Sequence, residues 1–264
     1  MTEKDYSSPA ISLENVHYVY PDRTKAINGI TIRIDKGEKV SFIGPNAAGK
    51  STLIMLLNGV LRGEGDIRIF GTKIDDNSDR KIKSMIGIVF QNPDDQLFCP
   101  SIYEDVAFGP LNFGIPKEEI GLRVRNALNE VGLKGYEKRS SLHLSFGEKK
   151  LVSIATILSS DPEIIALDEP TSNLDSYHRR KIINWIKKSN RTVLIATHDL
   201  DMVADTAERA IILRDGVVTR DGKVEDLLRD QILLENNCLE LPLSLQPVPV
   251  TLKKRNNPDN LLSL

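Results

Sequence analysis

The stretch KGEKVSFIGPNAAGKST, from Lys36 to Thr52, places a strand, a loop and a helix one after another. The apolar run at residues 40–43 is typical of a buried strand, and residues 52–57 are typical of a helix. Between them stand a glycine, four residues, a second glycine, a lysine and a serine, which is the phosphate-binding loop pattern. Glycines let backbone N–H groups curl into a cradle, and the helix N-terminus adds donors and a positive dipole end. The stretch therefore predicts a nucleoside triphosphate site.

Two side chains of this loop suit a phosphate ligand that carries magnesium. Lys50 would bring its ammonium to the β- and γ-phosphates, and Ser51 would offer its hydroxyl to Mg²⁺. The alternative is a glycine-rich turn in which the lysine has no role. The flanking strand and helix argue against that alternative, because a chance match to the loop would rarely bring both.

Length, charge and cysteine content limit the kinds of protein that this chain can be. The 264 residues suffice for one large α/β domain with an insertion, and a net charge of −2 gives no electrostatic case for nucleic acid. The two cysteines, Cys99 and Cys238, form neither a metal-ligand spacing nor a disulfide framework. No apolar run approaches the length of a membrane span, so other subunits would supply it if the protein works at a membrane.

Hydrophobic periodicity divides the rest of the chain into elements. Alternating apolar positions predict early antiparallel strands at residues 11–20 and 30–34. Residues 75–84 form a polar stretch, and residues 92–114 are rich in Pro, Gly and aromatics. Further strands are expected at 66–70, 86–90, 164–167, 192–197, 210–213 and 217–219, the last two around an Asp215-Gly216 turn, and helices at 116–131, after Ser145 and at 176–188.

These elements suggest a main domain and a short extension. The domain is expected at 9–228, with a helical insertion at about 92–160 in an α/β core. Residues 229–264 contain several prolines and then turn polar, so we expect a small C-terminal extension whose final dozen residues are mobile.

Polar residues follow the apolar strands at positions suited to phosphate chemistry. In α/β sheets, ligands gather at the carboxyl ends of the strands. Asp168 has the form of the acid that holds Mg²⁺ through coordinated waters, and Glu169 could polarise a water for attack on the γ-phosphorus. His198 could bond the γ-phosphate or orient Glu169, although a lone histidine is more often structural. Gln91 after the 86–90 strand is equally ambiguous by itself.

The segment Ser145-Phe-Gly-Glu148 allows two readings that are compatible. Serine followed three residues later by glutamate is a capping box, which explains both residues by local helix chemistry. The functional alternative is a helix N-terminus that carries a serine and a glycine to a phosphate. A capped helix can still present its backbone donors.

Six motifs in a fixed order resemble the ATP-binding-cassette (ABC) ATPases. They are GPNAAGKS, Gln91, LSFGEKK from Leu144, IIALDEP to Pro170, SNLD ending at Asp175, and His198, and they span roughly residues 11–226. The resemblance implies the P-loop NTPase fold of that family, with a mixed central sheet, an antiparallel β subdomain and an inserted α-helical subdomain. The segments FQNPDDQLF and SIYEDVAFGPLNFG look most like the ATPases of energy-coupling-factor importers of the cobalt/nickel type.

The resemblance also implies a role for each matched residue. Mg²⁺ would be held by Ser51, Gln91 and Asp168. Glu169 would be the catalytic base, and His198 and Gln91 would assist catalysis. Tyr20 would stack on adenine, although Tyr18 has the same parity and could take its place. ATP would be held by Tyr20, Gly44, Pro45, Asn46, Ala47, Ala48, Gly49, Lys50, Ser51 and Thr52, and the ATP of a second copy would be contacted by Ser145 and Gly147, with Asp175 near the seam.

Two positions depart from the family pattern. Ala47 stands where glycine is usual, and its methyl costs little unless φ is positive there. Phe146 stands in the signature where a second glycine is commoner, which puts close approach of that backbone in question. Ser145 and Gly147 remain, so we expect activity to survive both changes.

The resemblance implies an ATP- and Mg²⁺-dependent subunit of an importer of the energy-coupling-factor type, for cobalt, nickel or a vitamin. Its partners would be a second ABC ATPase, identical or paralogous, and integral membrane subunits, and its location the cytoplasmic side of the cell membrane as a peripheral protein. The alternative is a soluble ABC ATPase with no transport role. The DNA-repair and translation kinds would add a long heptad insertion or a second cassette with a basic linker, and neither occurs in the sequence.

Overall fold

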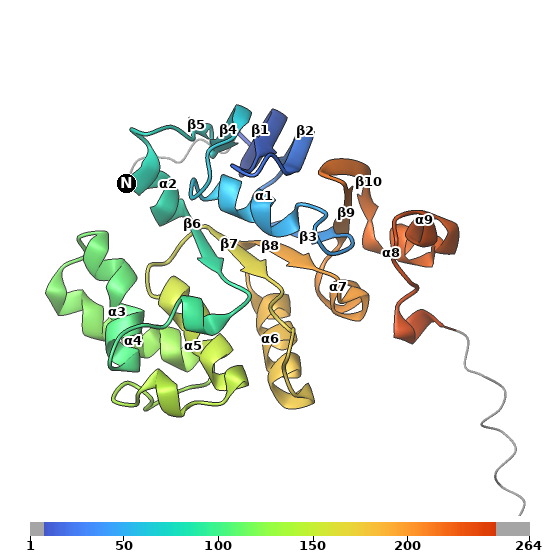
Figure 1. The fold of residues 1–264 in the computed structure, drawn as a ribbon. Coiled ribbons are helices and arrows are strands. Elements are labelled where there is room, and N and C mark those ends of the chain that lie inside the picture. Colours follow the sequence, from blue (N-terminus) through green and yellow to red (C-terminus); the bar gives the residue numbers. More distant parts are fainter. Residues whose placement is uncertain (1–7, 247–264) are drawn as a thin grey trace, which may run out of the picture.

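The computed structural model describes residues 8–246, which form two sheets with helices between and around them (Figure 1). The first sheet is antiparallel throughout, and its strands carry apolar side chains that alternate with polar ones. This arrangement confirms the antiparallel strands expected near the N-terminus. In spatial order the strands are β2 (Lys25–Ile34), β1 (Ile11–Val19), β4 (Glu64–Ile69) and β5 (Thr72–Lys73).

The second sheet is the mixed central sheet. In spatial order its strands are β10 (Val217–Lys223), β9 (Arg209–Arg214), β3 (Lys39–Ile43), β8 (Thr192–Thr197), β7 (Ile164–Asp168) and β6 (Ile86–Val89). Three of them, β6, β7 and β8, are buried along their whole length, as expected for parallel strands covered on both faces. In this sheet only β10 runs antiparallel, joined to β9 by the Asp215-Gly216 turn.

The parallel register brings four strand ends to one edge. β3, β8, β7 and β6 are neighbours, so the residues that follow them lie side by side. This places the phosphate-binding loop, Gln91, the acidic pair and His198 at the same edge of the sheet, as the sequence predicts. The paired positions near the strand ends are Ile43 with Thr197, Ala196 with Asp168, and Leu167 with Val89.

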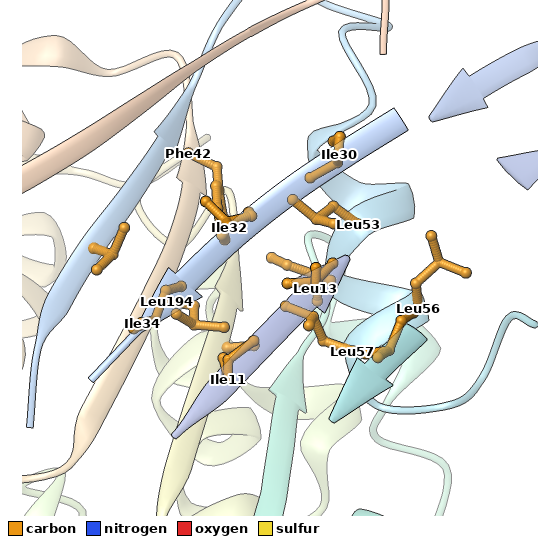
Figure 2. Packing of buried hydrophobic residues seen from close by; sticks show 14 of the residues in the cluster. Ile11, Leu13, Ile30, Ile32, Ile34, Phe42, Leu53, Leu56, Leu57 and Leu194 are labelled. Atoms are coloured by element: carbon orange, nitrogen blue, oxygen red, sulfur yellow. The ribbon is translucent and has the colours of Figure 1, made fainter. Parts of the chain in front are cut away.

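The core between the two sheets is built around α1 (Lys50–Leu57), which follows the phosphate-binding loop (Figure 2). Leu53, Leu56 and Leu57 of this helix meet apolar side chains of β1 and β2, all of them buried. Burying each such side chain contributes about 1.5–3 kcal/mol, so this cluster holds the loop firmly against the sheet.

Helices occupy the chain between β6 and β7. A second core cluster joins them to the lower face of the central sheet through α5 (Phe146–Leu158) and α6 (Ser176–Lys188) (Figure 1). Helix α3 (Ile102–Asn112) lies in a stretch with no strand pattern. It begins at a capping box between Ser101 and Glu104 and includes Pro110. The elements are η1 (Pro93–Asp95), α3 (Ile102–Asn112), α4 (Lys117–Glu130), η2 (Ser141–His143) and α5 (Phe146–Leu158).

The remaining helices flank the sheets. The polar stretch at 75–84 contains α2 (Asp79–Met85), and the helix expected at 176–188 is α6 (Ser176–Lys188). The domain boundaries remain a prediction, and the final dozen residues expected to be mobile lie outside the described part. The last elements are α7 (Leu200–Thr206), α8 (Val224–Arg229), α9 (Gln231–Asn236) and η3 (Leu243–Leu245). Within residues 8–246, every helix is too short or too polar to span a bilayer.

Candidate functional site: a nucleotide cavity at the end of the central sheet

The loop between β3 and α1 curls around its own lysine. Lys50 Nζ donates to the carbonyl oxygens of Gly44 at 2.7 Å and Pro45 at 2.9 Å. Burial lowers the pKa of Lys50, and the nearby carboxylates of Glu169 and Asp168 oppose that effect. Gly49 has a φ of 100°, and a β-carbon there would lie 2.5 Å from the carbonyl oxygen of Ala26, so only glycine fits. The result is the N–H-lined, positively charged cradle that a phosphate chain requires.

Ala47 has a positive φ, which is the case in which its methyl group carries a cost. The angle is 62°, in the left-handed region. That conformation costs an alanine roughly 1–2 kcal/mol relative to a right-handed one. The loop therefore has, at Ala47, the left-handed backbone conformation that usually requires glycine.

Ser51 and Asp168 form the part of the site that suits magnesium. The Ser51 hydroxyl donates to Asp168 Oδ1 at 3.0 Å, from the start of α1 to the end of β7. Burial raises the pKa of Asp168, and the adjacent Glu169 carboxylate adds to the increase. A hydroxyl and a carboxylate are oxygen donors of the kind that Mg²⁺ takes in small number, completing its shell with phosphates and water. In residues 8–246 no three His, Cys, Asp or Glu side chains gather into a group that could hold a metal ion.

Glu169 is held rigidly at the end of β7. Its Oε2 accepts hydrogen bonds from Thr197 Oγ1 at 2.9 Å and Ser172 Oγ at 3.1 Å. Its Oε1 accepts the backbone N–H of His198 at 3.2 Å and lies 2.8 Å from that residue's Nδ1. The residue is 6 % exposed and has a φ of 43°, a left-handed conformation unfavourable for glutamate.

Of the two interactions considered for His198, the structure shows the contact between its ring and Glu169. The side chain is 59 % exposed, which leaves the other ring nitrogen able to face a ligand. Thr197 was not among the expected site residues. The only signal for it in the sequence is a hydroxyl at the last position of a strand that ends beside the acidic pair.

A cavity of about 390 Å³ joins these parts. It brings residues 46–52 of the loop together with Glu169, His198 and Gln91, whose side chain is exposed. Tyr20 lines the same cavity and shares a 3.0 Å hydrogen bond between its hydroxyl and Thr52 Oγ1. Tyr18 packs edge-on against Tyr20 with ring centroids 4.9 Å apart and is not part of the lining, which favours Tyr20 as the aromatic residue facing the ligand.

The signature segment lies outside this cavity. Ser145 and Glu148 form the expected capping box at the start of α5, which holds the pKa of Glu148 below its usual range through the Ser145 N–H. Gly147 is buried against the ring of His178, which a β-carbon would strike. Asp175 caps α6 through the His178 N–H at 2.9 Å, and its other oxygen lies 2.6 Å from the His178 ring. His178 thus ties Asp175 to the signature, a link that the sequence did not reveal.

Lys150 and Gln96 were not predicted from the sequence, because only the fold shows which groups their side chains contact. Lys150 on α5 is 0 % exposed, and its ammonium donates to the carbonyl oxygens of Phe90 at 2.8 Å and Gln91 at 2.6 Å. Burial lowers its pKa to about 8. Gln96 accepts the Phe90 N–H at 3.2 Å and donates to α5 at Ser153 O, 2.9 Å away. Both residues join α5 to the end of β6.

Comparison with known proteins agrees with this geometry. The ABC transporter family matches residues 27–172. The energy-coupling factor transporter ATP-binding protein EcfA of Methanothermobacter thermautotrophicus is 46% identical over 238 residues, covering 88% of this chain and 76% of that protein.

Solved structures give the same result. CbiO1 of Clostridium perfringens, described as part of the ABC transporter complex cbiONQ, has a TM-score of 0.77 and 35% identity, covering 87% of this chain and 94% of that one. A dimeric ATP-binding cassette bound to ADP and Pi in a post-hydrolysis state has a TM-score of 0.73 and 31% identity, covering 81% and 98%. The phosphate loop, the acidic pair and the signature occur here on the fold that these relatives share. This chain therefore belongs to the ABC transporter family, as one of its ATP-hydrolysing subunits.

Proposed function

We propose that this chain powers an importer of the energy-coupling-factor type, in which two cassettes close on ATP and separate membrane subunits carry cobalt, nickel or a vitamin. The similarity to EcfA and CbiO1 supports this type of transporter. In this proposal the protein is peripheral, on the cytoplasmic side of the cell membrane. The transported substrate would be contacted by the membrane subunits.

The observation that carries the catalytic part of the proposal is the fixed carboxylate of Glu169. Three donors and the His198 ring hold it beside a cavity that the phosphate loop lines. Lys50 would bind the β- and γ-phosphates, and Ser51 and Asp168 would hold Mg²⁺, which neutralises charge on the phosphates when bound. Glu169 would accept a proton from the attacking water, Gln91 would contribute to holding Mg²⁺, and His198 would contact the γ-phosphate.

The second ATPase copy enters through the signature. Ser145, Gly147 and Asp175 lie outside the cavity that Tyr20 and residues 46–52 line, as do the proposed ATP contacts Gly44 and Pro45. In the proposed dimer Ser145, Gly147 and Asp175 would reach the ATP of the partner cassette, so that each site is completed by the other copy. The helix N-terminus at Ser145 can offer backbone donors to a phosphate while its own side chain caps the helix.

A Glu169→Gln variant tests the hydrolytic assignment. The amide keeps the size of the side chain but cannot accept the proton, so turnover should fall at least about 100-fold while ATP binding persists and dimers accumulate. Turnover is measured by phosphate release and the dimer by light scattering. Glu240→Gln, at an exposed glutamate outside the cavity, is the matched control and should behave as the unmodified chain. Near-normal turnover in Glu169→Gln would remove the assignment.

An apolar surface beside β6 is where we propose that the membrane subunits dock. Phe98 and Phe108 are 66 % and 48 % exposed and pack edge-on with centroids 5.0 Å apart. A cavity of about 220 Å³ lies between β6, α3 and α5, with Phe90 and Phe113 in its wall. Exposed aromatic residues are suited to receive a protein partner. Phe90 in the cavity wall directly precedes Gln91, so docking there would act close to the nucleotide cavity.

Recovery of membrane proteins by the tagged chain tests the transport assignment. Detergent extracts should yield integral membrane subunits with the unmodified chain and fewer with Phe98→Ser. Ile232→Ser is the control, because Ile232 is 72 % exposed on α9, far from α3 in the structure (Figure 1). Recovery of ribosomes or nucleic acid alone would contradict the proposal and favour a non-transport ABC ATPase.

A further inference from the structure

Lys150 is a buried cation that does not line the nucleotide cavity. It is 0 % exposed on α5, and its side chain passes into the protein to reach the chain just beyond β6. A charged amine is costly to bury unless it is well hydrogen-bonded. Here the ammonium is bonded to two successive backbone carbonyls, those of Phe90 and Gln91, at 2.8 Å and 2.6 Å.

These two bonds determine how the backbone runs through Gln91. A carbonyl oxygen fixed in direction fixes its peptide plane, because the peptide unit is planar. The planes before and after Gln91 both carry an oxygen bonded to Lys150, so the direction in which the Gln91 side chain leaves the backbone is set by this lysine. That side chain lines the nucleotide cavity.

Gln96 strengthens the same junction from another direction. Its Oε1 accepts the N–H of Phe90 at 3.2 Å, and its amide donates to Ser153 O and Thr156 Oγ1 of α5 at 2.9 Å and 2.7 Å. The chain leaving β6 is therefore bonded to α5 rather than left as a free loop. α5 is also the helix whose N-terminal cap is Ser145.

We propose that Lys150 is a positioning residue that holds Gln91 toward the nucleotide cavity, and that through this contact α5 links the signature at Ser145 to the site of its own chain. The inference rests on the role proposed above for Gln91. In a dimer, the signature of one chain would serve the ATP of the other. Lys150 would then connect the two composite sites, since movement of α5 displaces the Gln91 backbone.

A purely structural role for Lys150 makes a different prediction. Lys150→Met leaves the carbonyl oxygens of Phe90 and Gln91 without this donor, so the melting temperature should fall in either case. A purely structural role predicts that turnover per folded molecule stays normal. A positioning role predicts that turnover per folded molecule falls as well.

The test compares four full-length variants by melting temperature, ATP binding, turnover number and the Mg²⁺ concentration for half-maximal turnover. For Lys150→Met we expect binding within about twofold, a turnover number about 10- to 100-fold lower and a higher Mg²⁺ requirement, as for loss of a group that orients a metal-site residue. Gln91→Ala should show the same pattern. Lys134→Met is the control, because Lys134 is an exposed lysine outside α5 and outside the nucleotide cavity. Lys150→Gln keeps N–H donors and should retain more turnover than Lys150→Met.

Different results would contradict the positioning role of Lys150 and the proposed role of Gln91. If Gln91→Ala loses turnover while Lys150→Met retains it, the positioning role is wrong and the role of Gln91 stands. If Gln91→Ala is fully active, the assumption about Gln91 fails. Equal losses in the Lys134 and Lys150 variants would also overturn the inference, as would a loss of stability in Lys150→Met with normal turnover per folded molecule. If Lys150→Met does not fold, Lys150→Gln is assessed by the same criteria.

Discussion

Removing one hydroxyl, that of Thr197, should weaken both the fold and the catalysis of this protein. Thr197 is fully buried at the end of β8. Its Oγ1 donates to Glu169 Oε2 at 2.9 Å and accepts the N–H of Asp199 at 3.0 Å. Thr197→Val keeps the shape of the side chain but leaves that N–H and one carboxylate oxygen without this partner.

The magnitude follows from the two bonds. A hydrogen bond to a charged group contributes about 1.5–3 kcal/mol and one between neutral groups about 0.5–1.5 kcal/mol. Thr197→Val loses one bond of each kind. Because Ser172 and His198 still hold Glu169, we expect a loss near the lower end of the two contributions combined, about 2–3 kcal/mol of unfolding free energy. The freed carboxylate should also lower turnover about tenfold or more through misorientation.

Thr197→Ser is the matched variant, because it keeps the hydroxyl and loses only a methyl, for which about 1 kcal/mol is expected. Unfolding free energies come from urea titration, and turnover from phosphate release at saturating ATP. Our reasoning requires the serine variant to be the more stable and the more active of the two. The reverse order would show that the methyl, and not the hydroxyl, is what the site needs.

Two further substitutions address the signature and its neighbour. Gly147→Ala would press a β-carbon on the His178 ring, so we expect turnover to fall about tenfold or more while ATP affinity, measured by equilibrium binding, stays the same; unchanged turnover would contradict the close packing. Asp175→Ala removes the cap of α6 and should cost about 1 kcal/mol of unfolding free energy in a urea titration, with Asp175→Ser recovering much of it; equal stability of both variants would contradict the capping role.

The order and type of the main elements could be predicted where local signals agree. The helix expected at 176–188 forms over the same residues, because an aspartate cap precedes it and its apolar residues keep one face. α3 was hidden by glycines, aromatics and Pro110, which lower helix propensity in a segment whose packing against α5 stabilises it. Tertiary contact decided that element, and no local pattern could show it.

Some parts of the candidate site could also be predicted from the sequence, and others could not. Strand ends and loop spacing sufficed to bring Lys50, Ser51, Asp168 and Glu169 to one place, because parallel neighbours end at a common edge. The positive φ of Ala47 could not be seen, since alanine gives no sign of a left-handed backbone. The direction of the Lys150 side chain was equally hidden, because a lysine in a polar helix start is usually at the surface.

The left-handed backbone of Glu169 sets stability against activity at a single position. Such a conformation costs a non-glycine residue roughly 1–3 kcal/mol, which glycine would not incur. Glycine at position 169 would relieve this strain, but it would remove the carboxylate and its hydrogen bonds from Ser172, Thr197 and the His198 N–H. Stability engineering of this protein should hold residue 169 fixed and seek its gains elsewhere, since here a more comfortable backbone removes the proposed base.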